Sequence, residues 1–416
     1  MGTRVFRNTA VAPAEQPQTF SGAVRKLGGS VDLPLLLIMV ATLTFGLIMV
    51  FSASPDFSLY HHGDPWYIFL RQVLWVFMGT VVAYVLSRID YHYWRTLILP
   101  IMFGTLALLV AVLLVGDERL GSIRGLIEGS IQPSELAKVA TVIYLAVWLH
   151  SKREQFHDIT WGLLPMAVIL GMIGGLIYLQ PDLSATATVF LLGGLLFFLA
   201  GGDLRQILFL FVVALVVGVL VVQVSPTGRD RMGSYLNGIQ NPLEASYHVR
   251  RSLEAIVKGG WFGVGIGRAD TKYLGLPLAA TDSIFAVIAE ELGILGALGT
   301  ILLYAGIVWR GIRIAAKAPD VLGNLLATGL TFWLATEAAI NILVMVGLMP
   351  FAGNALPFIS AGGSSMTVSL MAIGILLNVS RQEKPLTAQS ERREYGAVLD
   401  MRGRNRRRSL SRISRS

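Results

Sequence analysis

The chain has 416 residues, of which 54% are hydrophobic and 14% are charged, a composition too apolar for a water-soluble globule of this size. It contains no cysteine, which excludes disulfides, Cys-ligated metal sites and a thiol nucleophile. The formal net charge of +8 comes largely from an arginine-rich C-terminal arm and therefore says little about a substrate.

Apolar segments close to the ~20 residues that an α-helix needs to cross a bilayer recur about ten times along the chain. They predict an all-α polytopic membrane protein with about ten transmembrane helices in a domain from residue 32 to residue 382. The predicted spans are 34–51, 66–86, 96–115, 134–150, 161–179, 183–200, 206–224, 283–309, 322–348 and 364–379. Residues 1–30 are polar and the first apolar run lacks a small-residue cleavage site, so we expect residues 1–31 to remain as a cytoplasmic N-terminal segment.

Lysine and arginine flank the predicted spans mainly on one side, which the positive-inside rule assigns to the cytoplasm. Arg25 precedes the first span, Arg88 follows the second and Lys152 follows the fourth. Both termini are therefore predicted to be cytoplasmic. Residues 225–282, between the seventh and eighth spans, form a large extracellular loop in this topology, although they also carry basic residues; long loops weigh less in the rule.

The C-terminal residues 383–416 are dense in arginine and serine and predict a basic, disordered cytoplasmic tail. We expect this tail to bind anionic lipid headgroups, because it is tethered at the membrane. Nucleic acid is a much weaker alternative and is not an expected partner.

Charged residues in the predicted spans need a partner or a function, because each costs ~2.5–3.5 kcal/mol on insertion scales. Glu135 opens the fourth span after a proline, as suits a helix N-terminus, and Lys138 lies on the same face one turn further. Spacing alone leaves a structural Glu135–Lys138 pair and a functional role equally open. Asp182 precedes the sixth span, where it either caps the helix or faces a cavity.

Further acidic residues lie in the eighth and ninth spans. Asp282 stands at the start of the eighth span, in the pattern of an N-cap residue. Glu290 and Glu291 follow two turns later and point about 100° apart, so at most one shares a face with Asp282. Glu337 lies inside the ninth span, where we expect it to pair with an arginine or stay neutral in a structural role.

Two glycine-rich segments interrupt the helical pattern. The segment Gly259–Gly267 resembles a phosphate-binding loop only superficially, because no strand or Rossmann unit surrounds it, and we reject nucleotide binding. Its glycines predict a re-entrant or surface loop that a lipid passes closely. The segment Gly362–Ser365 breaks the chain before the last span, and its amides either meet an anion or cap the helix.

Four separated motifs, taken in order, resemble the SEDS family of polytopic membrane proteins, which includes RodA and FtsW. They are Gln132-Pro133-Ser134-Glu135-Leu136-Ala137-Lys138, Gln180-Pro181-Asp182-Leu183, the Gly259–Gly267 segment followed by Thr281-Asp282, and Leu356-Pro357-Phe358-Ile359-Ser360-Ala361-Gly362-Gly363-Ser364-Ser365. The chain departs from the usual family pattern at Gly125, Ser184, Arg251 and Glu337.

The resemblance implies a peptidoglycan glycosyltransferase of the bacterial plasma membrane that joins lipid II units, in cell elongation or division. It implies that Asp282 is the carboxylate essential for polymerisation, which would orient or deprotonate the acceptor hydroxyl. It also implies that Lys138 lines an extracellular cavity and meets substrate phosphate. The other residues expected to bind substrate are Glu135, Arg124, Asp182, Arg229, Arg251, Lys258 and Ser364.

By the same resemblance, the expected partner is a class B penicillin-binding protein, a transpeptidase that crosslinks the nascent strand. A divalent cation, Mg²⁺ or Mn²⁺, stays open as an additional source of positive charge, with no ligands identified. The alternatives to an enzyme are a lipid II flippase or carrier and a scaffold for cell-wall enzymes. Because the charged residues collect near one side of the membrane, the pattern favours the enzyme.

Overall fold

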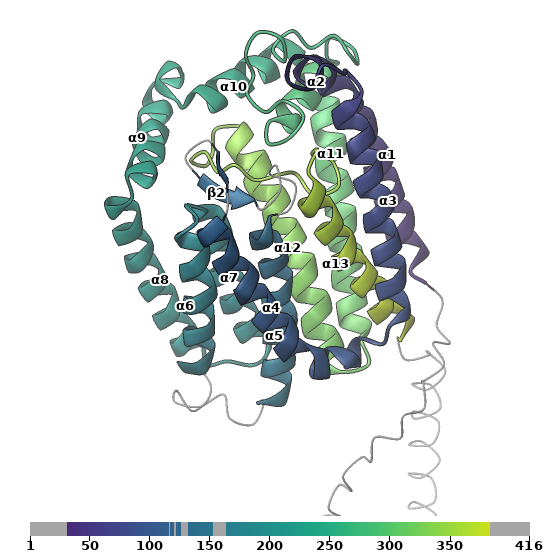
Figure 1. The fold of residues 1–416 in the computed structure, drawn as a ribbon, viewed down its shortest axis with the longest axis vertical. Coiled ribbons are helices and arrows are strands. Elements are labelled where there is room, and N and C mark those ends of the chain that lie inside the picture. The colour runs from purple at the N-terminus through teal and green to yellow at the C-terminus, as the bar shows by residue number, and fades with distance from the viewer. Residues whose placement is uncertain (1–30, 116, 120–121, 126–131, 153–163, 383–416) are drawn as a thin grey trace, which may run out of the picture.

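The computed structural model describes residues 31–115, 117–119, 122–125, 132–152 and 164–382. Within these residues the chain forms a bundle of long apolar helices (Figure 1). They are α1 (Leu33–Ala53), α3 (Tyr67–Arg88), α4 (Trp94–Val115), α5 (Pro133–Ser151), α6 (Leu164–Tyr178), α7 (Leu183–Leu199), α8 (Leu204–Val224), α11 (Ile284–Lys317), α12 (Val321–Met345) and α13 (Gly363–Arg381). Each overlaps one predicted span, so the prediction of a helical polytopic fold is confirmed.

Among the described helices, seven are long and apolar enough to cross a membrane, whereas α6 and α7 are shorter apolar helices. The number of crossings and the cytoplasmic placement of both termini stay predictions. The predicted N-terminal segment and basic tail lie outside the described residues, apart from residue 31 at the start of the bundle.

The predicted extracellular loop is largely helical. It contains α9 (Pro226–Gln240), the short 3-10 helix η4 (Pro242–Glu244) and α10 (Tyr247–Gly259). Helix α10 lies across the same end of the bundle as the short helix α2 (Pro55–His62) (Figure 1). The described residues also include the 3-10 helix η1 (Tyr91–Tyr93) and an antiparallel pair of short strands, β1 (Asp117–Arg119) and β2 (Ser122–Gly125).

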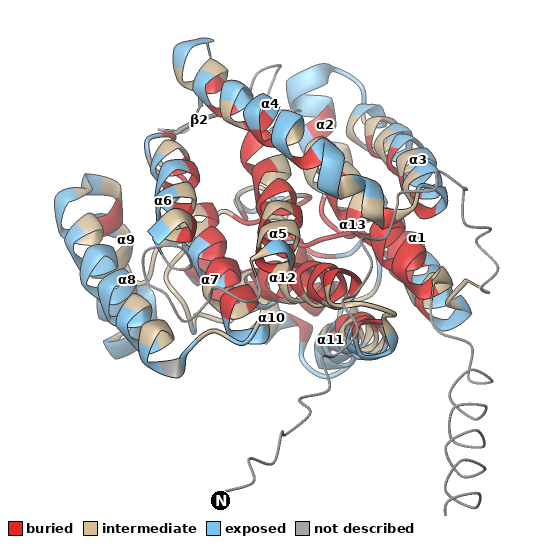
Figure 2. Ribbon diagram, turned by 90° about the horizontal axis from the view of Figure 1, so that it is seen from below, coloured by how far each residue is buried: buried red, intermediate tan, exposed pale blue. Residues whose placement is uncertain are grey.

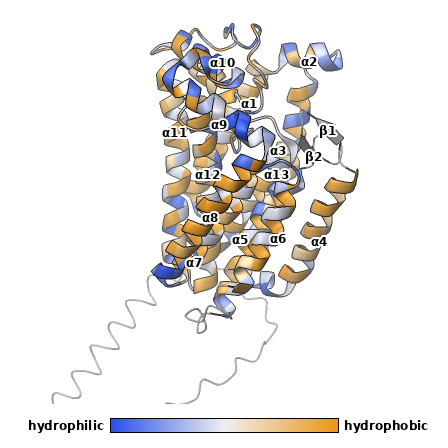
Figure 3. Ribbon diagram, turned by 90° about the vertical axis from the view of Figure 1, so that its left-hand side faces the viewer, coloured by the Kyte–Doolittle hydropathy of each residue, from blue (hydrophilic) through white to orange (hydrophobic). Residues whose placement is uncertain are grey.

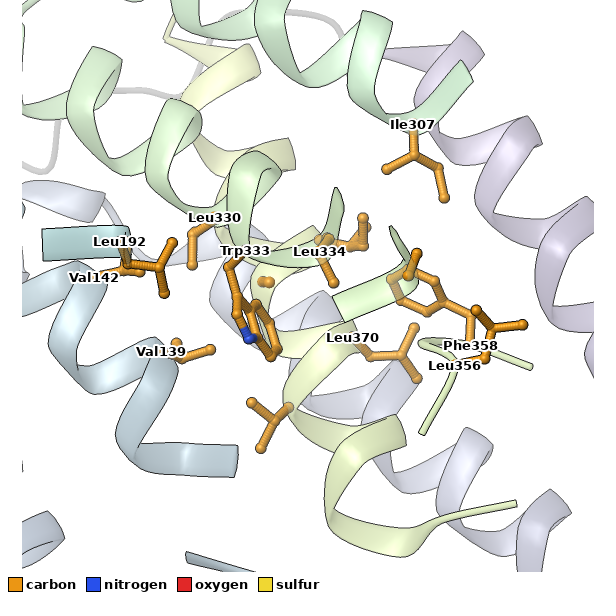
Figure 4. Close-up of a cluster of buried hydrophobic side chains, with 14 of the residues drawn as sticks. Val139, Val142, Leu192, Ile307, Leu330, Trp333, Leu334, Leu356, Phe358 and Leu370 are labelled. Carbon is orange, nitrogen blue, oxygen red and sulfur yellow. The ribbon is translucent and has the colours of Figure 1, made fainter. Parts of the chain in front are cut away.

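Buried residues concentrate on α5, α12 and α13 in the centre of the bundle (Figure 2). Trp333 is 1% exposed and packs among apolar side chains of the neighbouring helices, including Val139 and Leu370 (Figure 4). The outer helices instead expose apolar residues, which suits contact with lipid (Figures 2 and 3). In α8, none of the residues in its most apolar 18-residue stretch is buried inside the protein. Helices α3 and α13 approach closely because residue 374 is a glycine. A Cβ on Gly374 of α13 would lie 2.5 Å from the Ala83 carbonyl oxygen on α3.

Helix α11 is broken at Gly293, whose φ of 68° and ψ of −166° are not helical. The glycine-rich loop fills the break. The amides of Val264 and Gly265 donate to the carbonyls of Glu290 and Glu291 at 3.0 Å, and the Ile294 amide donates to the Gly260 carbonyl at 2.9 Å. The predicted surface loop is thus present, and its glycines allow its backbone to replace hydrogen bonds that the broken helix lacks.

We expect Gly293→Ala to destabilise the protein strongly. The added Cβ would lie 2.4 Å from the Trp261 carbonyl oxygen, and strained backbone of this kind costs roughly 1–3 kcal/mol before any clash is counted. Gly299→Ala is the matched control, because a Cβ at this position of the same helix meets nothing within 4 Å. Thermal unfolding in detergent should show a clear loss for Gly293→Ala and little change for Gly299→Ala. Equal stability of the two variants would contradict this account of the break.

Candidate functional site

Four of the bundle helices, α5, α7, α11 and α13, begin at the same end of the molecule, and the four sequence motifs lie at these helix starts or in the segments that lead to them (Figure 1). Asp182 joins the first two motifs. Its Oδ1 accepts hydrogen bonds from the Ala185 amide at 3.2 Å and from Ser184 at 2.9 Å, so the predicted capping of α7 is confirmed. Its Oδ2 also lies 3.4 Å from the Ser134 hydroxyl, at the start of α5. Asp182 therefore caps one helix and contacts another.

Ser364 joins the fourth motif to the first. Its hydroxyl oxygen accepts a hydrogen bond from the Gln132 amide at 3.1 Å, while the Gln132 side chain reaches Asp182 at 3.4 Å. The beginnings of α5, α7 and α13 are thus tied together by side chains that the sequence singles out.

Lys138 forms two ion pairs inside the bundle. Its Nζ lies 2.9 Å from Glu135 Oε1 and 2.7 Å from Glu337 Oε1. The Lys138 and Glu337 side chains are 2% and 4% exposed, respectively, and the Lys138 ammonium lies 5.9 Å from the centre of the Trp333 ring. The structural pair that spacing allowed is therefore present. The prediction that Glu337 pairs with an arginine was wrong, because the structure pairs it with Lys138.

Asp282 is half-buried and lies one residue outside the cap position of α11. The helix begins at Ile284 with Ser283 as its N-cap residue, and the Ser283 side chain makes no cap hydrogen bond, so the N-cap position falls on Ser283 and not, as predicted, on Asp282. The Asp282 carbonyl accepts a hydrogen bond from Asn341 Nδ2 at 2.8 Å. The residue is thus held through its main chain.

A hydrogen-bonded path connects Asp282 to the Lys138 ion pairs. Asn341 Nδ2 donates both to Asp282 and, at 2.6 Å, to the Asn354 carbonyl. Asn354 Nδ2 in turn donates to Glu337 Oε2 at 2.8 Å, and the other oxygen of Glu337 accepts from Lys138. The main chain of Asp282 and the Lys138 ammonium therefore belong to one hydrogen-bonded framework.

Glu290 and Glu291 are buried and hold the predicted extracellular loop instead of extending the site. Glu290 Oε1 accepts a hydrogen bond from the Asp270 amide at 3.0 Å. Glu291 pairs with Lys272 at 2.9 Å, and both contact Ser52 of α1. These contacts fix the first half of α11, which directly follows Asp282. Lys272, Asn341 and Asn354 were not predicted as site residues. Asn341 could have been found from the sequence, because it is a polar residue inside an apolar span.

The basic loop residues lie on separate helices. Arg229 is exposed on α9, whereas Arg251 and Lys258 on α10 both contact Glu254, at 2.7 and 3.4 Å. Hydrogen bonding to Arg251, aided by Lys258, holds the pKa of the Glu254 carboxyl below its usual range. In the part of the chain that the structure describes, these contacts do not bring the three bases to Lys138.

Two predictions gain no support from the geometry. Arg124 lies in β2, and its side chain is outside the described residues. Among the residues described, no group of three or more His, Asp or Glu side chains is arranged to hold a metal ion. The divalent cation therefore stays a prediction without ligands.

Relatives of known name match nearly the whole described domain. Stage V sporulation protein E of Bacillus subtilis is 39% identical over 359 residues, which cover 85% of this chain and 98% of that protein. A probable peptidoglycan glycosyltransferase FtsW of Trichlorobacter lovleyi is 39% identical over 364 residues, covering 86% and 96% of the two chains.

Solved structures show the same fold. A chain from a structure described as the coordination of polymerization and crosslinking by a peptidoglycan synthase complex superposes with a TM-score of 0.70 at 28% identity, covering 85% of this chain and 98% of that one. The rod shape determining protein RodA of Thermus thermophilus gives a TM-score of 0.64 at 26% identity, with 86% and 98% covered. The family model described as "Cell cycle protein" matches residues 33–385, so this multi-pass membrane protein belongs to the FtsW/RodA/SpoVE family.

Proposed function

We propose that this protein is a peptidoglycan glycosyltransferase that joins lipid II disaccharide units and releases undecaprenyl pyrophosphate. The observation that carries the proposal is the hydrogen-bonded framework that holds Asp282 and Lys138 at one end of the bundle. A carboxylate and an ammonium in one site are suited to a reaction in which a hydroxyl attacks and a pyrophosphate leaves.

The reaction is a single displacement with inversion. The 4-hydroxyl of the acceptor sugar attacks the anomeric carbon of the donor, a new C–O bond forms, and the bond to the pyrophosphate oxygen breaks with its electron pair. Asp282 orients the hydroxyl and accepts its proton. One base near the acceptor and positive charge near the leaving group are sufficient for this step.

Lys138 alone does not neutralise the pyrophosphate, because Glu135 and Glu337 already surround its single charge. Its role is to supply one ammonium at the leaving group while it holds the two carboxylates in place. The remaining positive charge comes from the basic residues predicted to bind substrate on the extracellular side, Arg229, Arg251 and Lys258. No step is assigned to a divalent cation, because no described cluster fits one.

The centre of the bundle favours an enzyme over a lipid II flippase. A carrier of a charged headgroup needs a polar path across the membrane. Between the Lys138 ion pairs at one end and the Asp32–Arg310 pair at the other, the described residues of α5 and α12 bury mainly apolar side chains, such as Leu145 and, in Figure 4, Leu330. The headgroup therefore reacts on the side where it binds.

The proposed partner is a class B penicillin-binding protein that crosslinks the strand as it forms, and the proposed location is the bacterial inner membrane. The chain resembles one component of a peptidoglycan synthase complex, which supports an assembly of this kind. Release of undecaprenyl pyrophosphate from lipid II by the purified protein and its partner tests the proposal. Lipid II that stays intact under conditions where the partner is bound would contradict it.

Removing residues 392–416 should leave polymerisation in detergent unchanged, because a cytoplasmic tail does not reach chemistry on the extracellular side. In cells the truncation should weaken membrane retention or partner recruitment, since anionic lipid contributes ~1 kcal/mol per basic residue near the surface. The check compares lipid II turnover by full-length and truncated protein in the same detergent. A severe loss of turnover would contradict the topology inferred from lysine and arginine.

A further inference from the structure

Three consecutive carbonyls that lead to α11 are held by residues of α12 and of the connection to α13. The Ala280 carbonyl accepts a hydrogen bond from the Ala361 amide at 2.8 Å. The Thr281 carbonyl accepts one from the Ser360 hydroxyl at 2.7 Å, and the Asp282 carbonyl accepts one from Asn341 Nδ2 at 2.8 Å. The main chain at Asp282 is therefore fixed from outside its own helix.

The donor Ser360 is itself fixed. It is 3% exposed, and its hydroxyl oxygen accepts a hydrogen bond from the Leu356 amide at 2.7 Å. Gln72 of α3, also 3% exposed, donates to the Ser360 carbonyl and accepts from the Gly362 amide, both at 3.1 Å. A side chain on a third helix therefore holds the segment that holds Thr281.

The donor Asn341 is fixed in the same way. It is 1% exposed near the C-terminal end of the apolar helix α12, and its Nδ2 also donates to the Asn354 carbonyl. Asn354 is bound through its own amide to Glu337 and thereby to Lys138. A buried amide of this kind is expensive in lipid unless it is paired, and both bonds of its nitrogen go to main-chain carbonyls.

The turn before α11 provides part of this constraint, because the Thr281 and Ser283 amides donate to the Leu278 carbonyl at 3.0 and 3.2 Å. The bonds from Asn341 and Ser360 add donors from outside this turn. A general base must stay within hydrogen-bond reach of the proton it accepts, and a misplacement of about 1 Å from a distant substitution can cost ~10²-fold in rate. The backbone at Asp282 sets the position from which its carboxylate extends, so the donors that hold this backbone contribute to the position of the carboxylate.

We propose that Asn341 and Ser360 are positioning residues for Asp282, which set the orientation of its carboxylate through the main chain without touching the substrate. The inference rests on the proposed function. Gln72 holds the segment at Ser360, and Asn354 contacts Asn341. The hydrogen-bonded framework that includes Lys138 therefore also determines the position of the Asp282 carboxylate.

The test measures lipid II polymerisation by the complete protein with its transpeptidase partner, for Asn341→Ala and Ser360→Ala. Both variants should lower kcat about 10- to 100-fold and leave KM nearly unchanged, because an effect on geometry is felt in the transition state. Ser360→Thr keeps a hydroxyl and should recover most of the rate.

Asn324→Ala is the matched control. Asn324 lies on the same helix and donates through Nδ2 to the Ala315 carbonyl of α11 at 2.9 Å, at the opposite end of the bundle. It should lose some thermal stability, less than Asn341→Ala because Asn324 is half-buried and gives up one hydrogen bond instead of two, but it should keep its kcat. A second control introduces Asn341→Ala into an Asp282→Glu background, where the carboxylate is already displaced; there the additional loss should be small, because residues that act through one group are not additive.

Each outcome has a distinct meaning. If Asp282→Ala changes polymerisation but Asn341→Ala and Ser360→Ala resemble Asn324→Ala, the positioning proposal is overturned and the proposed function stands. If the two losses multiply fully in the Asp282→Glu background, Asn341 does not act through Asp282 and the proposal fails. If Asp282→Ala polymerises like the parent, the proposed role of the base is wrong, whatever the other variants do.

Discussion

Asp282→Ala is expected to abolish glycan polymerisation while the protein stays folded. Loss of a group that orients and deprotonates the acceptor costs ~10²–10⁴ in rate. The stability cost should be small, because Asn341 donates to the main-chain carbonyl of Asp282, which alanine keeps, and the N-cap position of α11 belongs to Ser283. Polymer length from labelled lipid II measures the first effect, and thermal unfolding in detergent measures the second.

Asp203→Ala provides the matched control for this prediction. Asp203 is the N-cap residue of α8, and its carboxylate accepts a hydrogen bond from the Arg205 amide at 2.9 Å. Its loss should cost about 1 kcal/mol of stability and leave polymerisation intact. Parental polymer lengths from Asp282→Ala together with reduced stability would show that this carboxylate is structural.

Lys138→Met is expected to have the second largest effect, because it acts on both stability and activity. Removing the ammonium leaves Glu135 and Glu337 buried without their shared cation, a change that typically costs 3–5 kcal/mol. The same change removes the ammonium that would stabilise the negative charge of the pyrophosphate leaving group. Lys138→Arg should also lose activity, because a planar guanidinium does not replace a compact ammonium between two carboxylates.

A charge-balanced variant separates these two effects. Glu135, Lys138 and Glu337 carry a formal charge of −1 when all three are ionised, and Lys138→Met combined with Glu337→Gln keeps that value. The double variant should regain much of the thermal stability lost by Lys138→Met but none of the polymerisation. Recovery of both would show that Lys138 serves only as a structural counter-ion.

Helical spans could be predicted because the bilayer demands a long apolar run for each helix, and α1, α3 and α8 follow those runs closely. The break in α11 could not. Gly293 sits in an otherwise apolar helical pattern, and only the contact with the loop at Gly260 and Val264 shows that the chain leaves the helix there. A break of this kind is set by tertiary contacts between distant segments.

The local contacts of the site could be predicted from sequence spacing, whereas its contacts between distant segments could not. Spacing of three residues allowed a Glu135–Lys138 pair, and the turn before α7 allowed Asp182 to cap that helix; the structure contains both contacts. Spacing does not show that Glu337, 199 residues away in sequence, reaches Lys138. The cap position of α11 was missed by one residue, because it depends on a turn in which Ser283 bonds to the Pro277 carbonyl.

We propose that this bundle polymerises lipid II at the end where Asn341, Asn354 and Glu337 link Asp282 to Lys138. The most direct measurement reconstitutes the purified protein with labelled lipid II and a transpeptidase partner whose own active site is blocked, and resolves the products by length. We predict long glycan strands from the parent and none from Asp282→Ala at equal protein and equal folding. Strands of the same length from both proteins, or lipid II that remains unpolymerised with the parent and partner bound together, would contradict the claim.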